Sequence, residues 1–213
     1  MKVRDVMTWN VVTVSSDMPI MEARKIMDAH GIRRLPVVDR GKLVGMVSKE
    51  RITRSSPSPA TSLSVWEINY LLAKMTVKEV MGKDPVTVDP DMSVEAAIAL
   101  AQKKGVGALP VVENHKLVGI ATTNDFFYKL LNPVLGIGKS GTRLVISKGG
   151  DIKNMQDILD SVKKAGAKII SFHTVAPLEG KEQDVCLHVD KEDVKRLVKD
   201  LATKGYATEI IER

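Results

Sequence analysis

The feature that most constrains this chain is a repeat within its own sequence. The segment VRDVMTWNVVTVSSDM, which starts at Val3, returns as VKEVMGKDPVTVDPDM, which starts at Val77. The segment LPVVDRGKLVG from Leu35 returns as LPVVENHKLVG from Leu109, so the offset is 74 residues in both cases. Over 50 aligned positions, 18 are identical and no gap is needed. A fixed period of this kind indicates a duplicated structural unit.

Each copy has the pattern of a β-α-β-β-α unit. The segment VVTV (PVTV in the second copy) predicts a strand, and the stretch after it has apolar residues three and four apart, which predicts a helix. Gly31 and Gly105 are expected to end these helices. Two strands joined by a polar turn follow, and a second short helix begins after Ser48 and after Thr122. The expected first helices are 20–30 and 94–104, and the expected strands are 11–14, 35–38, 42–47, 85–88, 109–112 and 116–121. Because one copy alone leaves a sheet face uncovered, we expect the two copies to pack face to face.

The segment SSPSPATS separates the copies and is expected to form turns rather than a regular helix or strand. Ser64 and Glu67 then have the spacing of a capping box, and SVWEINYLLAKM is expected to run as an amphipathic helix into the second copy. We therefore divide the chain into a first repeat (1–56), a linker with a helix (57–76), a second repeat (77–138) and a C-terminal domain (139–213).

The C-terminal domain carries the pattern β-α-β-β-α-β, the split βαβ arrangement of a ferredoxin-like sandwich, so the whole chain is expected to be an α+β or α/β protein. Strands are expected in TRLVISK, AKIISFHTV, DVCLHV and YATEII, the middle two joined by APLEGKEQ. Each helix is expected to place its apolar residues on one face and to end at a glycine, Gly166 or Gly205. These apolar residues are Ile152, Met155, Ile158, Leu159 and Val162 in the first helix, and Val194, Leu197, Val198 and Leu201 in the second.

Composition narrows the class of protein. The net charge is +6, from 32 Lys and Arg against 26 Asp and Glu, but the two signs are interspersed, whereas a nucleic-acid surface clusters its positive charge. No apolar run approaches the roughly 20 residues that a membrane helix needs. The N-terminal MKVRDVMTWN lacks the apolar core of an export signal. The single cysteine, Cys186, can form no internal disulfide, so we expect a cytoplasmic protein with no membrane partner.

The tandem LPVV…KLVG segments, with Thr122-Thr123-Asn124-Asp125 closing the second copy, resemble a pair of cystathionine-β-synthase (CBS) domains, the Bateman module, over roughly residues 1–138. The linker PSPATSLSVWEINYLLAKMTVKEVM is similar to the acetoin-utilisation (AcuB-like) branch, in which an ACT-like domain follows the pair. The resemblance implies a homodimeric regulatory module that binds an adenosyl compound (AMP, ADP, ATP or S-adenosylmethionine) in a cleft between the repeats. It also implies an ACT-like domain that binds an amino acid near its first strand–helix turn, here Lys148 to Asp151. A tight turn without a ligand is the equal alternative there, because the usual aspartate-then-proline-glycine signature is absent.

The stretch from Thr122 to Asp125 matches the T-x-x-D motif that holds the ribose in the family. A carboxylate accepts hydrogen bonds from the 2′- and 3′-hydroxyls, as the acidic residue of dinucleotide folds does. The alternative is a plain capping box, which has the same spacing. The first copy has Ser48-Lys49-Glu50-Arg51 at these positions, and the guanidinium of Arg51 offers no acceptor to a ribose. The first copy's cleft is thus expected to be empty or to bind a different anion.

In the family the second wall of each cleft comes from the opposite repeat. The Asp125 motif is therefore expected to face Val11, Val12, Arg33 and Arg34, with Ile120 against the adenine. Arginine suits phosphate because its planar fork can bond two oxygens at once. Alternatively, the two arginines are exposed cations after a helix, and Ile120 is an ordinary sheet residue. The Arg51 motif is expected to face Pro85, Val86, Gly107 and Ala108.

No catalytic constellation is found. The segment Gly138-Lys139-Ser140 has the end of a P-loop, but Pro133 stands where the first glycine is required. The four histidines and Cys186 lack metal-ligand spacing, and no serine, cysteine or lysine lies in a nucleophile motif. The sequence thus predicts a non-enzymatic regulatory protein that senses an adenosyl compound and transmits its state to the ACT-like domain or to a partner such as a regulated enzyme. The alternatives are a purely structural dimerisation module and a nucleic-acid-binding regulator.

Overall fold

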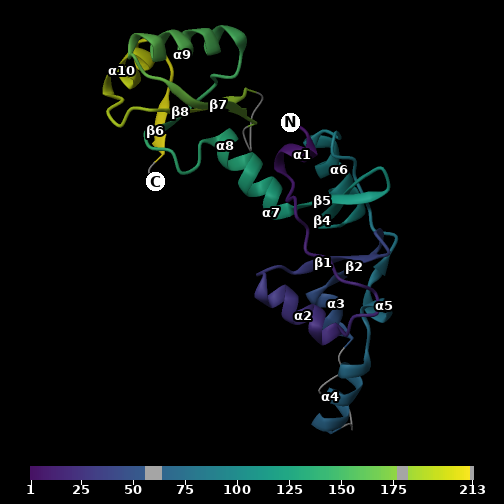
Figure 1. Ribbon diagram of the computed structural model, residues 1–213. Helices are drawn as coiled ribbons and strands as arrows, with labels where there is room; N and C mark the ends of the chain where they lie inside the picture. The colour runs from purple at the N-terminus through teal and green to yellow at the C-terminus, as the bar shows by residue number, and fades with distance from the viewer. Residues whose placement is uncertain (56–63, 177–181, 212–213) are drawn as a thin grey trace. The chain divides into compact units, whose positions relative to one another are not determined.

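The computed structural model describes residues 1–55, 64–176 and 182–211, which form two units, Met1–Phe127 and Tyr128–Arg213 (Figure 1). All but the first residue of the expected turn segment SSPSPATS, and most of the loop APLEGKEQ, lie outside the described residues. The domain boundaries expected from the sequence stay predictions. Within the described residues, no helix is long and apolar enough to cross a membrane.

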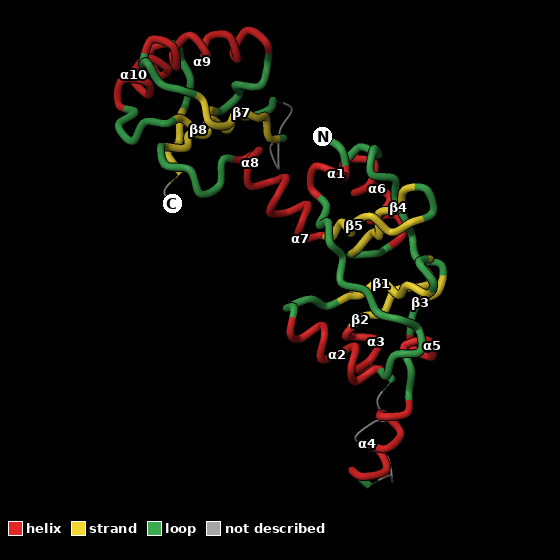
Figure 2. The backbone as a smooth tube through the Cα atoms, in the orientation of Figure 1, coloured by secondary structure: helices red, strands yellow, loops and turns green. Residues whose placement is uncertain are grey.

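The first unit contains two β-hairpins, each with helices on its outer side, and the hairpins face one another across the middle of the unit (Figures 1 and 2). Its elements are α1 (Val3–Val6), α2 (Ile20–Ala29), β1 (Arg34–Asp39), β2 (Lys42–Ser48), α3 (Lys49–Arg54), α4 (Val65–Lys74), α5 (Val77–Val80), β3 (Gly82–Lys83), α6 (Val94–Lys104), β4 (Ala108–Glu113), β5 (Lys116–Thr122) and α7 (Thr123–Asp125). A π-helix, η1 (Phe126–Leu131), follows α7.

The two hairpins repeat each other down to their register. Leu35 pairs with Val47 in the first and Leu109 with Ala121 in the second, and the register shifts after Val37 in one and after the equivalent Val111 in the other. The expected helices and hairpins of the two copies are confirmed, including α4 with its Ser64–Glu67 capping box. The two copies therefore share one backbone plan.

The strands expected in VVTV and PVTV are wrong. Val14 makes a single parallel bridge to Val37, and Val88 makes the equivalent bridge to Val111. Asn10, with a positive φ of 43°, turns the chain shortly before the bridge. After the bridge, the Ser16 N–H donates to the Asp39 carboxylate at 2.9 Å and not to the backbone of a strand. Pairing is therefore confined to one residue in this segment.

The start of each copy completes the other copy, which the sequence repeat does not reveal. The Val3 N–H donates to Met92 O at 2.9 Å, so α1 lies against the second copy. The Val77 N–H donates to Met18 O at 2.9 Å, and Val77 and Val80 of α5 belong to the buried core of the first copy, with Ile20. Each structural half is thus built from both sequence copies.

The second unit is a four-stranded antiparallel sheet in the order β7-β8-β6-β9. Its elements are α8 (Asn132–Leu135), β6 (Thr142–Ile146), α9 (Ile152–Lys164), β7 (Ile169–Val175), β8 (Asp184–Val189), α10 (Lys195–Thr203) and β9 (Thr208–Ile211). Ile158 and Val162 of α9 and Leu197 and Leu201 of α10 pack with the inward residues of β6 and β8. The element order β-α-β-β-α-β expected from the sequence is confirmed.

The apolar face expected for α9 is only partly buried. Ile158 is fully buried, but Ile152 and Leu159 are 78% and 42% exposed. Ile152 is the first residue of the helix, directly after its N-cap Asp151, and Leu159 is one residue, about 100° of helical rotation, past Ile158. The apolar arc is therefore wider than the face that meets the sheet.

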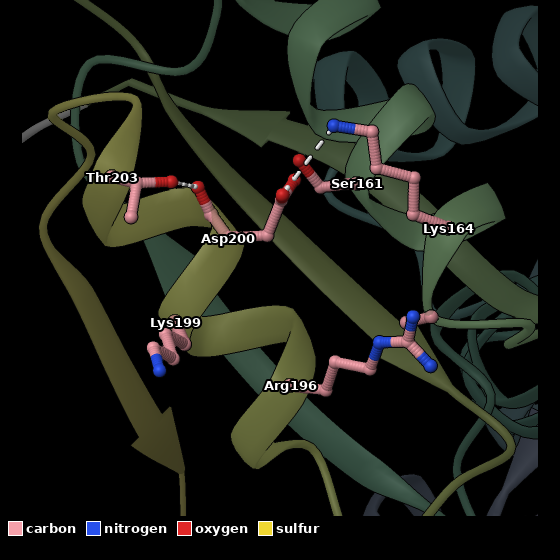
Figure 3. Close-up of a pocket in the computed structure, with 7 residues that line it drawn as sticks. Ser161, Lys164, Arg196, Lys199, Asp200 and Thr203 are labelled. Atoms are coloured by element: carbon pink, nitrogen blue, oxygen red, sulfur yellow. Dashed lines mark hydrogen bonds and ion pairs between the residues drawn. The ribbon is translucent and has the colours of Figure 1, made fainter.

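A carboxylate joins the two helices of this unit (Figure 3). Asp200 of α10 faces Ser161 and Lys164 of α9, and its Oδ1 lies 3.4 Å from the Lys164 ammonium. The Ser161 hydroxyl and the Lys164 ammonium hold the pKa of Asp200 below its ordinary value. Arg196 and Lys199, which line the same hollow, extend in different directions in Figure 3. The cations here do not converge on one point, and the geometry is that of a contact between helices.

The turn from Lys148 to Asp151 is packed closely against β8. A Cβ on Gly149 would lie 2.8 Å from Ile158 Cδ1, and one on Gly150 would lie 2.5 Å from Gln183 Cβ. The Gly150 N–H donates to Gln183 O at 2.9 Å, and Asp151 caps α9. The glycines are therefore explained by close packing of the turn. The amino-acid site expected here stays a prediction.

Candidate functional site

A cavity of about 620 Å³ lies between the two copies in the first unit. All seven residues singled out from the sequence line it, although they come from both copies of the repeat: Val11, Val12, Arg33, Arg34, Ile120, Thr122 and Asp125. The cavity thus brings together one carboxylate, two guanidinium groups and three aliphatic side chains. The roles of these residues toward a ligand stay predictions.

Asp125 is positioned by the end of β5 and the start of α7. Thr122 donates to Asp125 Oδ2 twice, from its N–H at 2.9 Å and from its hydroxyl at 2.6 Å. The Asp125 N–H donates back to the Thr122 hydroxyl at 3.3 Å, which completes a capping box. The carboxylate is thus held in one orientation while Asp125 still lines the cavity, 8% exposed. A capping role and a binding role are therefore compatible here.

The opposite wall of the cavity comes from the first copy. Arg33 and Arg34 follow the C-terminal end of α2 and are both exposed, and the Arg33 carbonyl accepts from the Lys49 N–H at 2.9 Å. The Arg34 guanidinium reaches the second copy, because a Cβ on Gly107 would lie 3.1 Å from its Nη2. In the described part of the chain, neither guanidinium is ion-paired with a carboxylate.

Gly107 was expected to face the Arg51 motif, and this expectation is wrong. Gly107 lines the Asp125 cavity. It precedes β4 directly, and its carbonyl accepts from the N–H and hydroxyl of Thr123 at 3.3 and 3.4 Å. Since β4 pairs with β5, Gly107 is held beside the motif of its own copy.

The cavity is also lined by nine residues that were not assigned to it from the sequence: Thr8, Asn10, His30, Gly31, Ile32, Pro36, Gly107, Thr123 and Asn124. Thr8 is the most informative, because its hydroxyl donates to Asp125 Oδ1 at 3.0 Å. Thr8 stands where the second copy has Gly82, but the two copies differ at most of their aligned positions, so the repeat alone did not mark it.

The Arg51 motif has a different surrounding. Ser48 caps α3 by accepting from the Arg51 N–H at 3.2 Å. The Arg51 side chain lies beside Gly82, where a Cβ would be 3.3 Å from its Nη2. The hollow at this motif is lined by Ser48, Glu50, Arg51, Arg54, Ser55, Glu79 and Val80, and not by the residues that line the Asp125 cavity. Arg54 is ion-paired with Glu50 at 2.7 Å.

The Asp125 cavity can accept hydrogen bonds from hydroxyl groups at its carboxylate end and can donate to an anion at its guanidinium end. The side chains of Val11, Val12 and Ile120 offer apolar contact between these ends. No group of three or more His, Cys, Asp or Glu side chains in residues 1–55, 64–176 and 182–211 is placed to hold a metal ion.

Comparison with known proteins relates the first unit to one family. The model of the CBS domain matches residues 3–58 and 77–132, which are the two copies of the repeat. An inosine-5′-monophosphate dehydrogenase of Korarchaeum cryptofilum is 33% identical over 125 residues, which cover 58% of this chain. The match spans 23% of that enzyme, so the enzyme is much longer than the segment it shares with this chain.

Two solved structures are similar to the same region. A structure described as an acetoin utilization protein (AcuB) from Vibrio cholerae has 32% identity and a TM-score of 0.53, covering 62% of this chain and 91% of that one. A structure of CBSX2 in complex with AMP has 27% identity and a TM-score of 0.52, covering 62% of this chain and 97% of that one. Since the family model matches both copies and more than half of the sequence, the chain belongs to the CBS-domain family.

Proposed function

We propose that this chain is a non-catalytic regulatory protein that binds an adenine nucleotide, or another adenosyl compound, in the Asp125 cavity. The observation that carries the proposal is that one cavity is lined by Asp125 from the second copy and by Arg33 and Arg34 from the first. The similar structure of CBSX2 contains AMP, which supports this class of ligand.

Each part of the cavity has a role in the proposal. Asp125 accepts from the ribose hydroxyls, and Thr122 fixes the carboxylate in place. Ile120, Val11 and Val12 give the adenine an apolar contact. Arg33 and Arg34 donate to phosphate oxygens, which bidentate guanidinium groups bind well.

The charge of the cavity orders the candidate ligands. Two guanidinium groups attract the phosphates of AMP, ADP and ATP, whereas the sulfonium of S-adenosylmethionine brings a positive charge toward them. We therefore rank the nucleotides above S-adenosylmethionine as ligands.

The second unit is proposed to be a ferredoxin-like, ACT-type domain, on the basis of its β-α-β-β-α-β order and its strand order. In the proposal it receives the signal from the first unit or binds a second ligand, and the chain acts as a homodimer or on a regulated enzyme. Nucleotide would shift the population toward one arrangement of the repeats only in proportion to its tighter binding there.

A thermal-shift panel tests the proposal on the full chain with AMP, ADP, ATP and S-adenosylmethionine. A ligand at 100 times its Kd stabilises the folded state by about 2.7 kcal/mol, so the midpoint should rise by about 5 °C or more. Asp125→Ala should remove the shift, while the matched variant Asp17→Ala, at an exposed position of the first copy, should keep it.

The panel also separates the alternatives. A module that only dimerises would show no shift with any of these compounds, and that result would refute the proposal. A shift that persists unchanged in Asp125→Ala would refute the ribose role of this carboxylate while leaving adenosyl binding in place.

A further inference from the structure

The structure singles out Thr8 as a partner of Asp125 in the cavity. Thr8 precedes Val11 and Val12, which line the cavity, and two backbone hydrogen bonds with Ile120, of 2.9 and 3.0 Å, hold Thr8 against the second copy. Its side chain lines the cavity and donates to Asp125 Oδ1 at 3.0 Å. We propose that Thr8 and Asp125 together recognise a cis-diol, so that the ligand must carry both the 2′- and the 3′-hydroxyl of a ribose. The inference rests on the proposed function and deepens it.

Asp125 Oδ2 is already occupied by two hydrogen bonds from Thr122. A carboxylate oxygen has two lone pairs, and this one accepts from the N–H and from the hydroxyl of Thr122, at 2.9 and 2.6 Å. A diol that bonded both carboxylate oxygens would have to break the capping box of α7. The ligand is therefore expected to use Oδ1 alone, and its second hydroxyl needs another acceptor.

Thr8 Oγ1 is placed to be that acceptor. It lies 3.0 Å from Asp125 Oδ1, and the two hydroxyl oxygens of a cis-diol lie about as far apart, so each hydroxyl can face one of these two acceptors. A hydroxyl group that donates one hydrogen bond can still accept through its own lone pairs. One ribose hydroxyl then donates to Oδ1 and its neighbour donates to Thr8 Oγ1, which polarises the Thr8–Asp125 bond further.

The first copy's motif supports the pairing of these two residues. The second copy has Gly82 where the first has Thr8, and the first copy has Arg51 where the second has Asp125, so the hydroxyl and the carboxylate are both replaced beside the Arg51 motif. The Arg51 guanidinium occupies the space beside Gly82 that a side chain there would enter. The two members differ together between the copies, as expected if they serve one recognition task.

The test is a calorimetric titration of the full chain with ATP, 2′-deoxy-ATP and 3′-deoxy-ATP. A site built to bond a hydroxyl rejects an analogue that lacks it, so the wild type should bind ATP at least about ten-fold more tightly than either analogue. Thr8→Val keeps the shape of the side chain and removes the hydroxyl. It should bind ATP about ten-fold more weakly and lose its preference over one of the two deoxy analogues.

Two variants control for a purely structural effect. Thr8→Ser retains the hydroxyl and should keep the preference for ATP over both analogues. Thr13→Val removes an exposed hydroxyl from the same segment and should bind all three nucleotides as the wild type does. The unliganded thermal midpoint of each variant shows whether it is folded.

The outcomes separate this inference from the proposed function. If the wild type binds none of the three nucleotides, both fail. If the wild type binds and Asp125→Ala does not, but Thr8→Val keeps both preferences, the role of Thr8 is refuted and the proposed function stands. If Thr8→Val weakens the binding of all three nucleotides by the same factor, Thr8 only supports the fold. The inference also requires that Thr8→Ser keeps the preference for ATP over both analogues.

Discussion

The two copies of the repeat share a backbone but differ in their chemistry. Both form an antiparallel hairpin with the same register and the same irregularity, followed by a helix capped by Ser48 or Thr122. The second copy's motif presents Asp125 to the large cavity, whereas the first copy's motif presents Arg51 beside Gly82. Duplication has supplied the scaffold twice and, in this chain, the carboxylate once.

The difference extends to the opposite wall. Arg33 and Arg34 of the first copy stand where the second copy has Gly107 and Ala108. The cavity is lined by Arg33 and Arg34 of the first copy and by Asp125 of the second, so the carboxylate and both guanidinium groups meet in a single cavity. Identical backbones thus need not make two equivalent sites.

The largest effect is expected from removing the arginine pair. In Arg33→Gln/Arg34→Gln, the loss of two charge-assisted interactions with phosphate should weaken ATP binding about 100-fold. Adenosine, which has no phosphate, should bind the variant and the wild type alike. Titration calorimetry at fixed ionic strength measures both.

The matched control removes two positive charges from α2, outside the cavity. Arg24→Gln/Lys25→Gln should change ATP affinity by less than about two-fold, since half-buried Arg24 and exposed Lys25 do not line the cavity and salt screens their charges at a distance. An equal loss in both double variants would mean that net charge, and not the cavity wall, governs binding.

The next largest effect tests how the copies complete one another. Val77 is fully buried in the core of the first copy although it belongs to the second in sequence. Val77→Ala should lower the free energy of unfolding by about 2 kcal/mol through lost burial and a cavity. Urea unfolding measures the loss.

Hydrogen exchange localises this effect. Val77→Ala should accelerate amide exchange in α2 and β1, while Val3→Ala, the equivalent change in α1, should accelerate exchange in β5 and α6. Faster exchange confined to the second copy in Val77→Ala would contradict the exchange of segments between halves.

Much of the fold was predictable from local pattern. The hairpins follow from apolar strands around a polar turn, and Gly105 ends α6 in the left-handed conformation, as its position suggested. The exchange of α1 and α5 was not predictable, because a repeat shows that two segments are alike and not which half each one completes. The strand expected in VVTV does not form, because this segment pairs with β1 at a single residue, and a local β-branched pattern does not show how many residues will find a partner.

The site was predictable where a motif marks it. Asp125 and Thr122 stand in such a motif, and Arg33 and Arg34 were placed by the alternation of walls between copies. Gly107 was misplaced because each of these residues is hydrogen-bonded beside the motif of its own copy, Arg33 to Lys49 and Gly107 to Thr123, and one cavity is lined by both. Thr8 was missed because a lone threonine carries no signal until its hydrogen bond to Asp125 is seen.

A smaller effect is expected from rebuilding the missing chemistry in the first copy. Arg51→Asp/Gly82→Thr restores the carboxylate and the hydroxyl, and the three heavy atoms nearest to a Cβ at Gly82 all belong to the Arg51 guanidinium group, which the first substitution removes. Calorimetry should show one ATP-binding site per wild-type chain and a second site of lower affinity in the variant. Lacking the arginine pair, the second site should bind about 100-fold more weakly. A wild type that binds two equivalents of equal affinity would remove the proposed difference between the copies.

The smallest effect concerns an acidic residue that differs between the hairpins. Asp39 accepts from the Ser16 N–H at 2.9 Å, whereas the equivalent Glu113 lies 3.6 Å from Arg4. Hydrogen bonds from the Ser16 side chain and N–H hold the pKa of Asp39 below its ordinary value. A lowered pKa means that the ionised group stabilises the fold above the ordinary pKa and that this contribution is lost as pH falls through the lowered one. The stability difference between the wild type and Asp39→Asn, from urea unfolding at pH 3 to 7, should therefore be largest near neutrality and shrink below about pH 4. A difference that grows on acidification would show that the Ser16–Asp39 contact does not favour the ionised carboxylate, and Glu113→Gln provides the comparison from the other hairpin.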